Sequence, residues 1–184
     1  MNIPSKKECF KLIKKMTMMD HIIDHSIMVS NVALFLSLKL KKHSPDLDSR
    51  LATSAALLHD ITKTRSFDTN ENHSETGGLM LIKLGYPEVG DIIRQHVILD
   101  SYEDNSRVSV EEIVNYSDKR ILHDKVVSLN KRLEYIEFRY GANKEFKNRI
   151  QTMWKNTLEL ENKIFCQLDI KPNQLSACVS KQIK

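Results

Sequence analysis

The sequence predicts an all-α protein, a single-domain bundle of about six to eight helices. Apolar residues recur at steps of three and four along most of the chain, and no stretch shows the strict alternation of a half-buried strand. The chain has 184 residues, which is enough to bury a core without covalent staples. We find no internal repeat and no low-complexity linker that would divide it.

The first elements are helices with one apolar face. Between Ser5 and Met18 apolar residues form one stripe and lysines lie opposite, so we expect a helix in residues 1–19 that packs on the domain. A second helix is predicted from Asp20 to about Lys42. Asp48 is placed to cap a third helix, which runs into His59.

The middle of the chain is predicted as a loop followed by two short helices. The segment Thr62–Asn72 is polar, has no periodicity and is expected to be a loop. A helix from His73 to Leu84 should stop at Gly85, and Pro87 suits the first turn of the next helix, which ends near His96.

Longer helices are expected in the last part. Ser109, with Glu112 three residues on, resembles a capping box at the start of a helix. A long helix, or a pair, covers about Asp124–Tyr140 and ends at Gly141, and a last helix covers Lys144–Leu168. We assign residues 141–170 to a C-terminal helix and expect residues 171–184 to be a loose polar tail.

The composition excludes several classes of protein. The net charge is +4 with both signs interspersed, so a stable nucleic-acid partner is not expected, although anionic small molecules are slightly favoured. Cys9, Cys166 and Cys178 lack metal or disulfide spacing and are interpreted as free thiols. No apolar run approaches the roughly 18–20 residues of a membrane span, and no signal peptide is evident. We therefore expect a cytoplasmic protein without a membrane partner.

The strongest functional signal is the pair His59-Asp60 at the end of the apolar run Leu51–Leu58. Ionisable groups next to a buried segment are costly unless they are paired, hydrogen-bonded or bound to a metal. Further candidate metal ligands of the same types occur on both sides of the pair, and they are His25, His73, His96 and Asp118. The set has the composition of a site for one or two metal ions built from separate helices.

Each candidate also has an ordinary structural explanation. His25 shares a helix face with Val29 and Ala33, as a hydrogen-bonded core histidine would. His21 lies one turn earlier and could pair with His25 on a metal, but the apolar stripe places His25 deeper. Lys63 could neutralise a phosphate beside the metal or be a solvated lysine. His43 and His123 fall outside the pattern and are expected on the surface or in supporting positions.

In the order and spacing of these residues, the chain resembles the HD-domain metal-dependent phosphohydrolases over roughly residues 20–140. The spacing looks like the HDIG branch, and the length is similar to that of small bacterial HD hydrolases that split diadenosine tetraphosphate. The resemblance implies that one ion is held by His25, His59, Asp60 and Asp118. It also implies that Asp60 bridges to a second ion held by His73 and His96, with Asp60 and Lys63 as catalytic residues.

The chain departs from the resembled pattern in two places. Thr62 stands where the HDIG motif has glycine, and Val97 follows His96 where the cyclic-dinucleotide branch has a second histidine. The second departure argues against a cyclic di-GMP enzyme. The segment from Asp118 through Arg132 and Arg139 looks like the C-terminal part of uncharacterised HD proteins, so the substrate stays open.

Three functions remain open at this level. The first is a hydrolase that cleaves a phosphoester or phosphoanhydride of a small nucleotide-type substrate, and we expect it to use two divalent ions such as iron or manganese. Lys63, with Arg120 or Arg139, would then offset the developing negative charge. The others are a nucleotide-sensing module without catalysis and a di-iron oxygenase of the HD type. The sequence determines neither the metal nor the oligomeric state.

Overall fold

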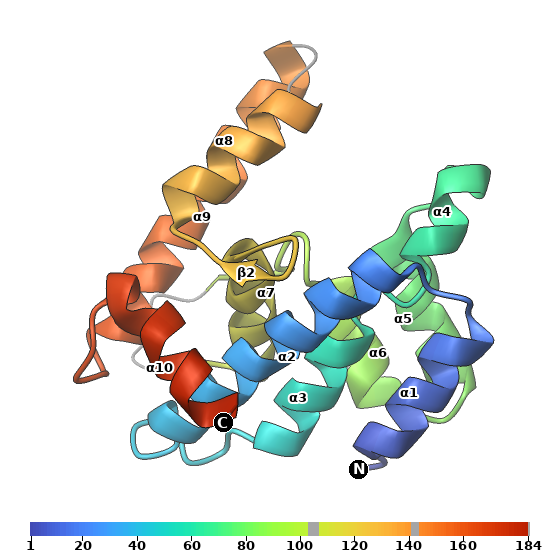
Figure 1. Cartoon of the computed structure of the whole chain (residues 1–184), viewed down its shortest axis with the longest axis horizontal. Helices are drawn as coiled ribbons and strands as arrows, with labels where there is room; N and C mark the ends of the chain where they lie inside the picture. The colour runs from blue at the N-terminus through green and yellow to red at the C-terminus, as the bar shows by residue number, and fades with distance from the viewer. Residues whose placement is uncertain (103–106, 141–143, 184) are drawn as a thin grey trace.

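Helices dominate the structure of the protein, which confirms the all-α prediction (Figure 1). The structure is a computed structural model and describes residues 1–102, 107–140 and 144–183. The elements are α1 (Lys6–Lys15), α2 (Asp20–Leu40), α3 (Ser49–Leu58), α4 (Lys63–Thr69), α5 (His73–Lys83), α6 (Pro87–Arg94), α7 (Val110–Lys119), β1 (Ile121–Leu122), β2 (Lys125–Val126), α8 (Leu129–Tyr140), α9 (Lys144–Phe165), the 3₁₀ turn η1 (Pro172–Gln174) and α10 (Leu175–Ile183). The helices exceed the number that we expected from the sequence.

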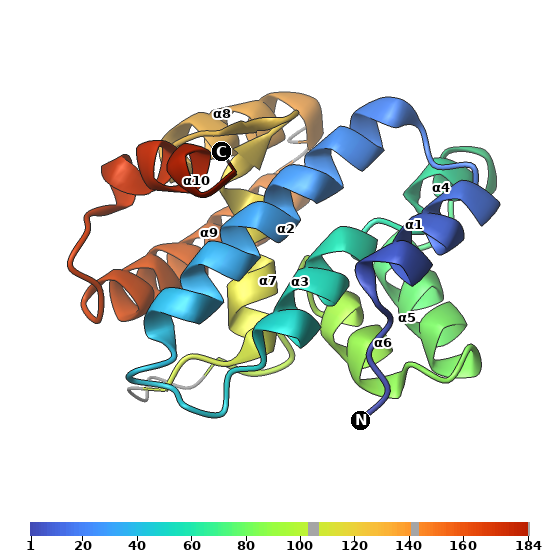
Figure 2. The same cartoon turned by 60° about the horizontal axis from the view of Figure 1, so that its bottom comes forward.

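Helix α2 runs through the centre of the domain and contacts α3, α7, α10 and the small β-hairpin (Figure 2). Its side chains Val29 and Leu36 are fully buried in the core. With 21 residues and a window of mean hydropathy 1.3, α2 is long and apolar enough to cross a membrane, which we did not expect from the sequence. However, 56% of that window is buried inside the protein, as in the core helix of a soluble domain.

The predicted helix starts are confirmed where polar caps mark them. The side chain of Asp48 accepts hydrogen bonds from the first turn of α3. Ser109 and Glu112 form the expected capping box at α7, and Ser5 forms another at α1. Gly85, with a φ of +86°, follows α5 in a left-handed conformation that favours glycine.

Helices α5 and α6 pack as a close pair because glycines lie at their contact. A Cβ atom on Gly78 would lie 2.7 Å from the carbonyl oxygen of Gly90, closer than two such atoms can approach. The close contact holds the start of α5 near the end of α6, where the two predicted histidine ligands of the second ion are located.

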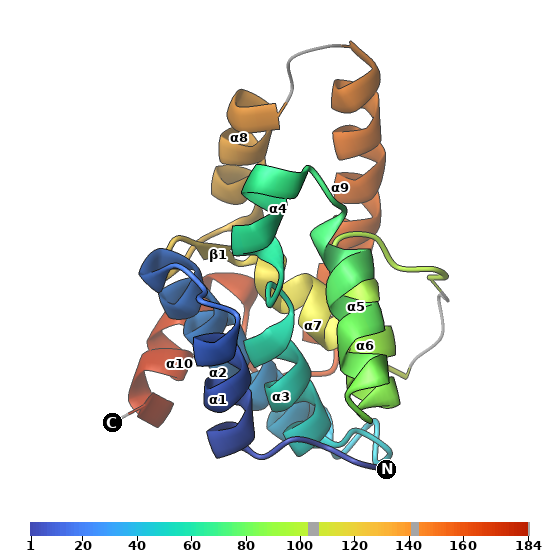
Figure 3. The same ribbon diagram turned by 90° about the vertical axis from the view of Figure 1, so that its right-hand side faces the viewer.

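Helices α8 and α9 lie side by side and project away from the other helices (Figure 1, Figure 3). The chain then returns, and α10 packs against α2 on the body of the domain (Figure 2). In Figure 1, α8 lies above the β-hairpin and α4 lies to the right of it.

Two sequence predictions about ordered structure were wrong. The segment Thr62–Asn72 contains helix α4, which has no buried residue and therefore no apolar stripe to reveal it. The tail from Lys171 is not loose through residue 183, because it forms η1 and α10 and buries Leu175 and Val179 completely or nearly so. In the sequence, the apolar pair Leu175 and Val179 is the main sign of helix α10.

The stretch before α8 also differs from the prediction. Residues 124–128 are not helical: β1 and β2 pair antiparallel, with Ile121 opposite Val126, and α8 begins at Leu129. Strands of two residues are too short to show an alternating pattern. Helix α9 ends at Phe165, three residues before the expected end, and the predicted stop at Gly141 lies outside the described residues.

Candidate metal centre

The structure brings the six predicted metal ligands together from five separate parts of the chain. Two groups have ligand atoms that all lie within 4.8 Å of one another, and these are His25, His59 and Asp60, and Asp60, His73 and His96. Asp60 belongs to both groups, while Asp118 lies beside the first. The arrangement has the geometry of two adjacent cation sites that share one carboxylate.

Helix ends position two of the imidazoles. His59 follows the last residue of α3, and its Nδ1 donates to the carbonyl oxygen of Ala56 at 2.7 Å. His96 follows the end of α6, and its Nδ1 donates to the carbonyl oxygen of Ile93 at 2.6 Å. Since a carbonyl oxygen can only accept, the proton lies on Nδ1 and the Nε2 lone pair is available to a metal.

His25 is fixed in the same way by a distant backbone group. Its Nδ1 donates to the carbonyl oxygen of His123 at 3.0 Å, in the turn between β1 and β2. His123 occupies a left-handed conformation there, with a φ of +57°. The Nε2 atom of His25 then faces the carboxylate of Asp118 at 2.9 Å. Three backbone carbonyls thus direct three Nε2 atoms inward.

Distances within the first group match the spacing of donors around one ion. His59 Nε2 lies 3.4 Å from Asp60 Oδ2 and 3.7 Å from Asp118 Oδ1. Donors that each bind one ion at about 2 Å are separated by about 3–4 Å. The structure therefore places His25, His59, Asp60 and Asp118 close together, as four ligands of one ion would be.

The second group uses the other oxygen of Asp60. Asp60 Oδ1 lies 3.2 Å from His73 Nε2 and 3.6 Å from His96 Nε2. The two imidazole Nε2 atoms are 3.3 Å apart. His73 is at the first position of α5, so the close packing of α5 on α6 is what brings it to His96.

Two buried atoms at the junction of the groups have no hydrogen-bond partner within the described ranges of the chain, and these are His59 Nε2 and Asp60 Oδ1. A buried polar atom without a partner costs free energy, typically about 1–3 kcal/mol. Both atoms are electron-pair donors that point into the cluster. Because a cation would satisfy both of them, the residues fit a bound metal.

Electrostatics keep the two carboxylates of the site in the ionised form that binds a metal. Burial raises the pKa of Asp60, but Lys63 and His59 outweigh burial and hold that pKa well below the ordinary value. Burial likewise opposes ionisation of Asp118, but the hydrogen bond from His25 and the charge of Arg132 hold its pKa well below the ordinary value. Both carboxylates are therefore ionised at neutral pH.

The two buried histidines behave differently. Burial, with the neighbouring His59, lowers the pKa of His96 to about 3, so His96 is neutral. Burial also acts to lower the pKa of His59, but the carboxylates of Asp60 and Asp118 outweigh it and raise that pKa above the ordinary value. A metal ion would displace a proton from His59 and none from His96.

A cavity of about 170 Å³ opens beside the first group. Lys63, whose Nζ lies 2.8 Å from Asp60 Oδ2, is one of its lining residues, as the phosphate-facing role expected for it requires. The other residues that line the cavity come from α2, the turn after α3, α4, the β-hairpin and α8, and they are His21, Ile22, His25, Asp60, Phe67, Leu122, His123, Arg132, Tyr135 and Arg139.

The structure also shows where the less certain candidates Arg120, His21 and Arg139 lie. Arg120 does not face the site: its guanidinium is buried against Tyr116, Glu161 and the carbonyl oxygens of Val127 and Pro172. It therefore joins α7 to the C-terminal segment, and its suggested role beside a phosphate was wrong. Exposed residues His21 and Arg139 line the cavity.

His123 was expected on the surface or in a supporting position, and it is both exposed and joined to His25 through its backbone carbonyl. That contact spans 98 residues, so no local pattern reveals the partner. Arg132 was not assigned to the site from the sequence. Arg132 lies 3.8 Å from Asp118 and lines the cavity. Arg132 lies seven residues before Arg139, a helical spacing that could have indicated from the sequence that both arginines face the site. His43 is exposed, as expected.

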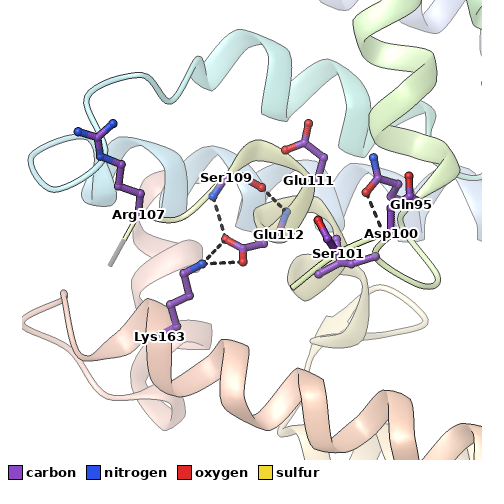
Figure 4. Close-up of a pocket in the computed structure, with 9 residues that line it drawn as sticks. Gln95, Asp100, Ser101, Arg107, Ser109, Glu111, Glu112 and Lys163 are labelled. Atoms are coloured by element: carbon purple, nitrogen blue, oxygen red, sulfur yellow. Dashed lines mark hydrogen bonds and ion pairs between the residues drawn. The ribbon is translucent and has the colours of Figure 1, made fainter. Parts of the chain in front are cut away.

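A second cavity, of about 350 Å³, lies between α7, α9 and the segment after α6 (Figure 4). Two of its charged groups pair with one another: Lys163 Nζ donates to both carboxylate oxygens of Glu112, at 2.7 and 2.9 Å. The Gln95 side chain accepts from the backbone of Asp100. Among the described residues that line it there is no histidine, so we place the candidate metal centre at the histidine cluster.

Comparison with known proteins identifies the family. A protein of Methanocaldococcus jannaschii whose name records it as uncharacterized is 25% identical over 137 residues, covering 67% of this chain and 80% of that protein. No solved structure gives a significant match. The HD domain family matches residues 22–136, which include all six candidate ligands. Because this match covers more than half of the chain, the protein belongs to the HD domain family, a membership that supports a metal-dependent hydrolase in general.

Proposed function

We propose that this protein is a metal-dependent phosphohydrolase that cleaves a phosphoester or phosphoanhydride bond of a nucleotide-type substrate. In this proposal His25, His59, Asp60 and Asp118 hold one divalent ion, and Asp60, His73 and His96 hold a second. The proposal goes beyond the family membership, because neither the relative's name nor the family match specifies the bond or the substrate.

The observation that carries the proposal is the sharing of Asp60 between two ligand groups next to a cavity lined by cations. Each group supplies nitrogen and oxygen donors with free electron pairs. Lys63, Arg132 and Arg139 line the adjacent cavity. Paired divalent ions beside cationic side chains are the elements that phosphoryl transfer requires.

When bound, divalent ions in such a site supply an activated water molecule and polarise a phosphoryl oxygen. The chain supplies the remaining functions. Asp60 stays ionised and fixes the spacing between the two groups, and the backbone carbonyls of Ala56 and Ile93 keep the imidazoles of His59 and His96 in orientation. Lys63 places an ammonium group in the cavity, where it can pair with phosphoryl oxygens.

The cavity lining favours a phosphate substrate over the polyol of a di-iron oxygenase. A neutral polyol gives no reason for the cations of Lys63, Arg132 and Arg139 to line the space beside the ligand groups. A sensing module that has lost catalysis would be expected to have lost ligands, whereas all six candidates are in position. The hydrolase is therefore the function that the site supports best.

The test is metal analysis of protein purified without added metal, followed by assays on a panel of nucleotide phosphates with manganese or ferrous ion. We expect about two ions per chain and release of phosphate or a nucleotide from at least one substrate. As a control, Asp24→Asn removes an exposed carboxylate on α2 outside the ligand groups and should leave turnover unchanged. Inertness of the wild-type protein toward the whole panel with either metal would refute hydrolysis.

A further inference from the structure

Helix α8 presents a row of polar side chains to the cavity beside the metal centre. Arg132, Tyr135 and Arg139 all line that cavity, and their spacing of three and then four residues places them on one face of the helix. The two arginines are seven residues apart, about 10 Å along the helix axis. The row therefore runs along α8, which projects away from the other helices (Figure 1).

Arg132 is largely buried, and yet no hydrogen-bond acceptor for it lies among the residues that the structure describes. Its side chain is 13% exposed, and its Nε is among the buried atoms without a partner. The nearest carboxylate oxygen, Asp118 Oδ1, is 3.8 Å from the guanidinium, beyond hydrogen-bond distance. A guanidinium has five N–H donors, so an anion in the cavity would satisfy groups that the described residues leave unsatisfied.

Aromatic packing holds this guanidinium in place. The Arg132 side chain lies over the ring of Tyr135, 5.8 Å from its centroid. That ring in turn packs edge-on against His123, with centroids 5.7 Å apart. The same hairpin turn that orients His25 thus also braces the helix face that carries Arg132, which fixes the position of its donors relative to the ligand groups.

Arg139 continues the row toward solvent. It is exposed, and its side chain makes no hydrogen bond or ion pair within the described part of the chain. Lys63 lines the same cavity from a different helix, α4. Because Arg132 and Arg139 are about 10 Å apart along the helix axis, several phosphoryl groups in a row would contact all three cations better than one group would.

We propose that α8 provides an anion-binding subsite, formed by Arg132 and Arg139, that selects substrates with two or more consecutive phosphoryl groups. In this arrangement the phosphoryl group nearest the metal centre pairs with Lys63 and Arg132, and the next groups extend along α8 to Arg139. The substrate class would be nucleoside diphosphates or longer polyphosphates rather than monophosphates. This assignment rests on the proposed function for the identity of the reaction, but the subsite can be tested by binding alone.

The experiment compares two non-hydrolysable probes, methylenediphosphonate and methylphosphonate, by calorimetric titration into manganese-loaded protein freed of excess metal. The wild-type protein should bind the diphosphonate at least about ten-fold more tightly than the monophosphonate. Arg132→Gln should weaken diphosphonate binding by roughly ten- to a hundred-fold, and Arg139→Gln, at an exposed position, by a smaller factor. Metal content, measured after each titration, should not change.

Lys131→Gln is the matched control, since it removes an exposed charge from the same helix without touching the cavity. Its binding of both probes should equal that of the wild type. Arg132→Lys keeps the charge and should retain more diphosphonate binding than Arg132→Gln. Diphosphonate binding by Arg132→Gln and Arg139→Gln as tight as that of the wild type would overturn the subsite. If the binding differences appear while every nucleotide remains uncleaved, the subsite stands and the proposed hydrolysis fails.

Discussion

Replacing Asp60 by asparagine removes the charge of the carboxylate that the two ligand groups share, while its shape stays almost the same. One Asp60 oxygen faces His59 and Lys63, at 3.4 and 2.8 Å, and the other faces His73 and His96, at 3.2 and 3.6 Å. Asparagine offers one oxygen and one NH₂ group, so whichever way it turns, one group of ligands faces a donor in place of an acceptor.

The expected loss of metal affinity is large and affects both ions. Removing a partner that only orients a metal ligand typically weakens binding about 10–100-fold. Asp60→Asn removes a charged donor itself, so we expect a loss of at least about 100-fold, or about 2.7 kcal/mol, for each ion. Both losses arise from one substitution because each group takes one oxygen of Asp60.

The assay is manganese titration of metal-free protein followed by metal analysis after gel filtration. Asp24→Asn, the same chemical change at an exposed position of α2, should leave both ions bound. Circular dichroism should show that Asp60→Asn remains helical. Retention of two tightly bound ions by folded Asp60→Asn would refute the assignment of Asp60 as the shared ligand.

Three further predictions follow from the same geometry. His73→Ala or His96→Ala should lower metal content from two ions toward one and cut turnover by orders of magnitude in a folded protein, whereas two ions retained by both variants would leave the second group without a metal. Acidification should destabilise the metal-free protein, because the pKa of His96 is about 3 in the folded state against an ordinary 6.5. The contribution of neutral His96 to the free energy of unfolding is present above pH 6.5 and is lost as the pH falls toward 3. The loss has an upper bound of about 5 kcal/mol. Thermal unfolding between pH 7 and pH 4 measures this, and a His96→Gln variant with the same pH dependence as the wild type would contradict it. Leu175→Ala should cost about 2–5 kcal/mol of unfolding free energy in urea denaturation, since Leu175 is fully buried in α10, and an unchanged midpoint would mean that the C-terminal helix does not pack on the domain.

The candidate ligands were predictable from the sequence where a local pattern marks them. His59 follows an apolar helix, His73 begins the next helix, and His25 shares a face with core residues. These patterns reveal that a side chain points inward, although they do not reveal which distant groups it meets. The contact of His25 with the carbonyl of His123 depends on a β-hairpin whose strands have two residues each, too few to show a periodic pattern.

The elements that were mispredicted have few buried side chains. Helix α4 buries none, so its sequence carries no apolar stripe and is polar like a loop. Helix α10 is marked mainly by Leu175 and Val179, which pack against α2 from the far end of the chain. In both segments tertiary position, which the local sequence does not encode, decides the structure.

The central claim is that two cation sites share Asp60, and anomalous diffraction from crystals grown with manganese tests it most directly. We predict two anomalous peaks about 3.5–4 Å apart, one beside His25, His59 and Asp118 and the other beside His73 and His96, with Asp60 between them. A single peak, or peaks away from Asp60, in crystals saturated with manganese would contradict the account.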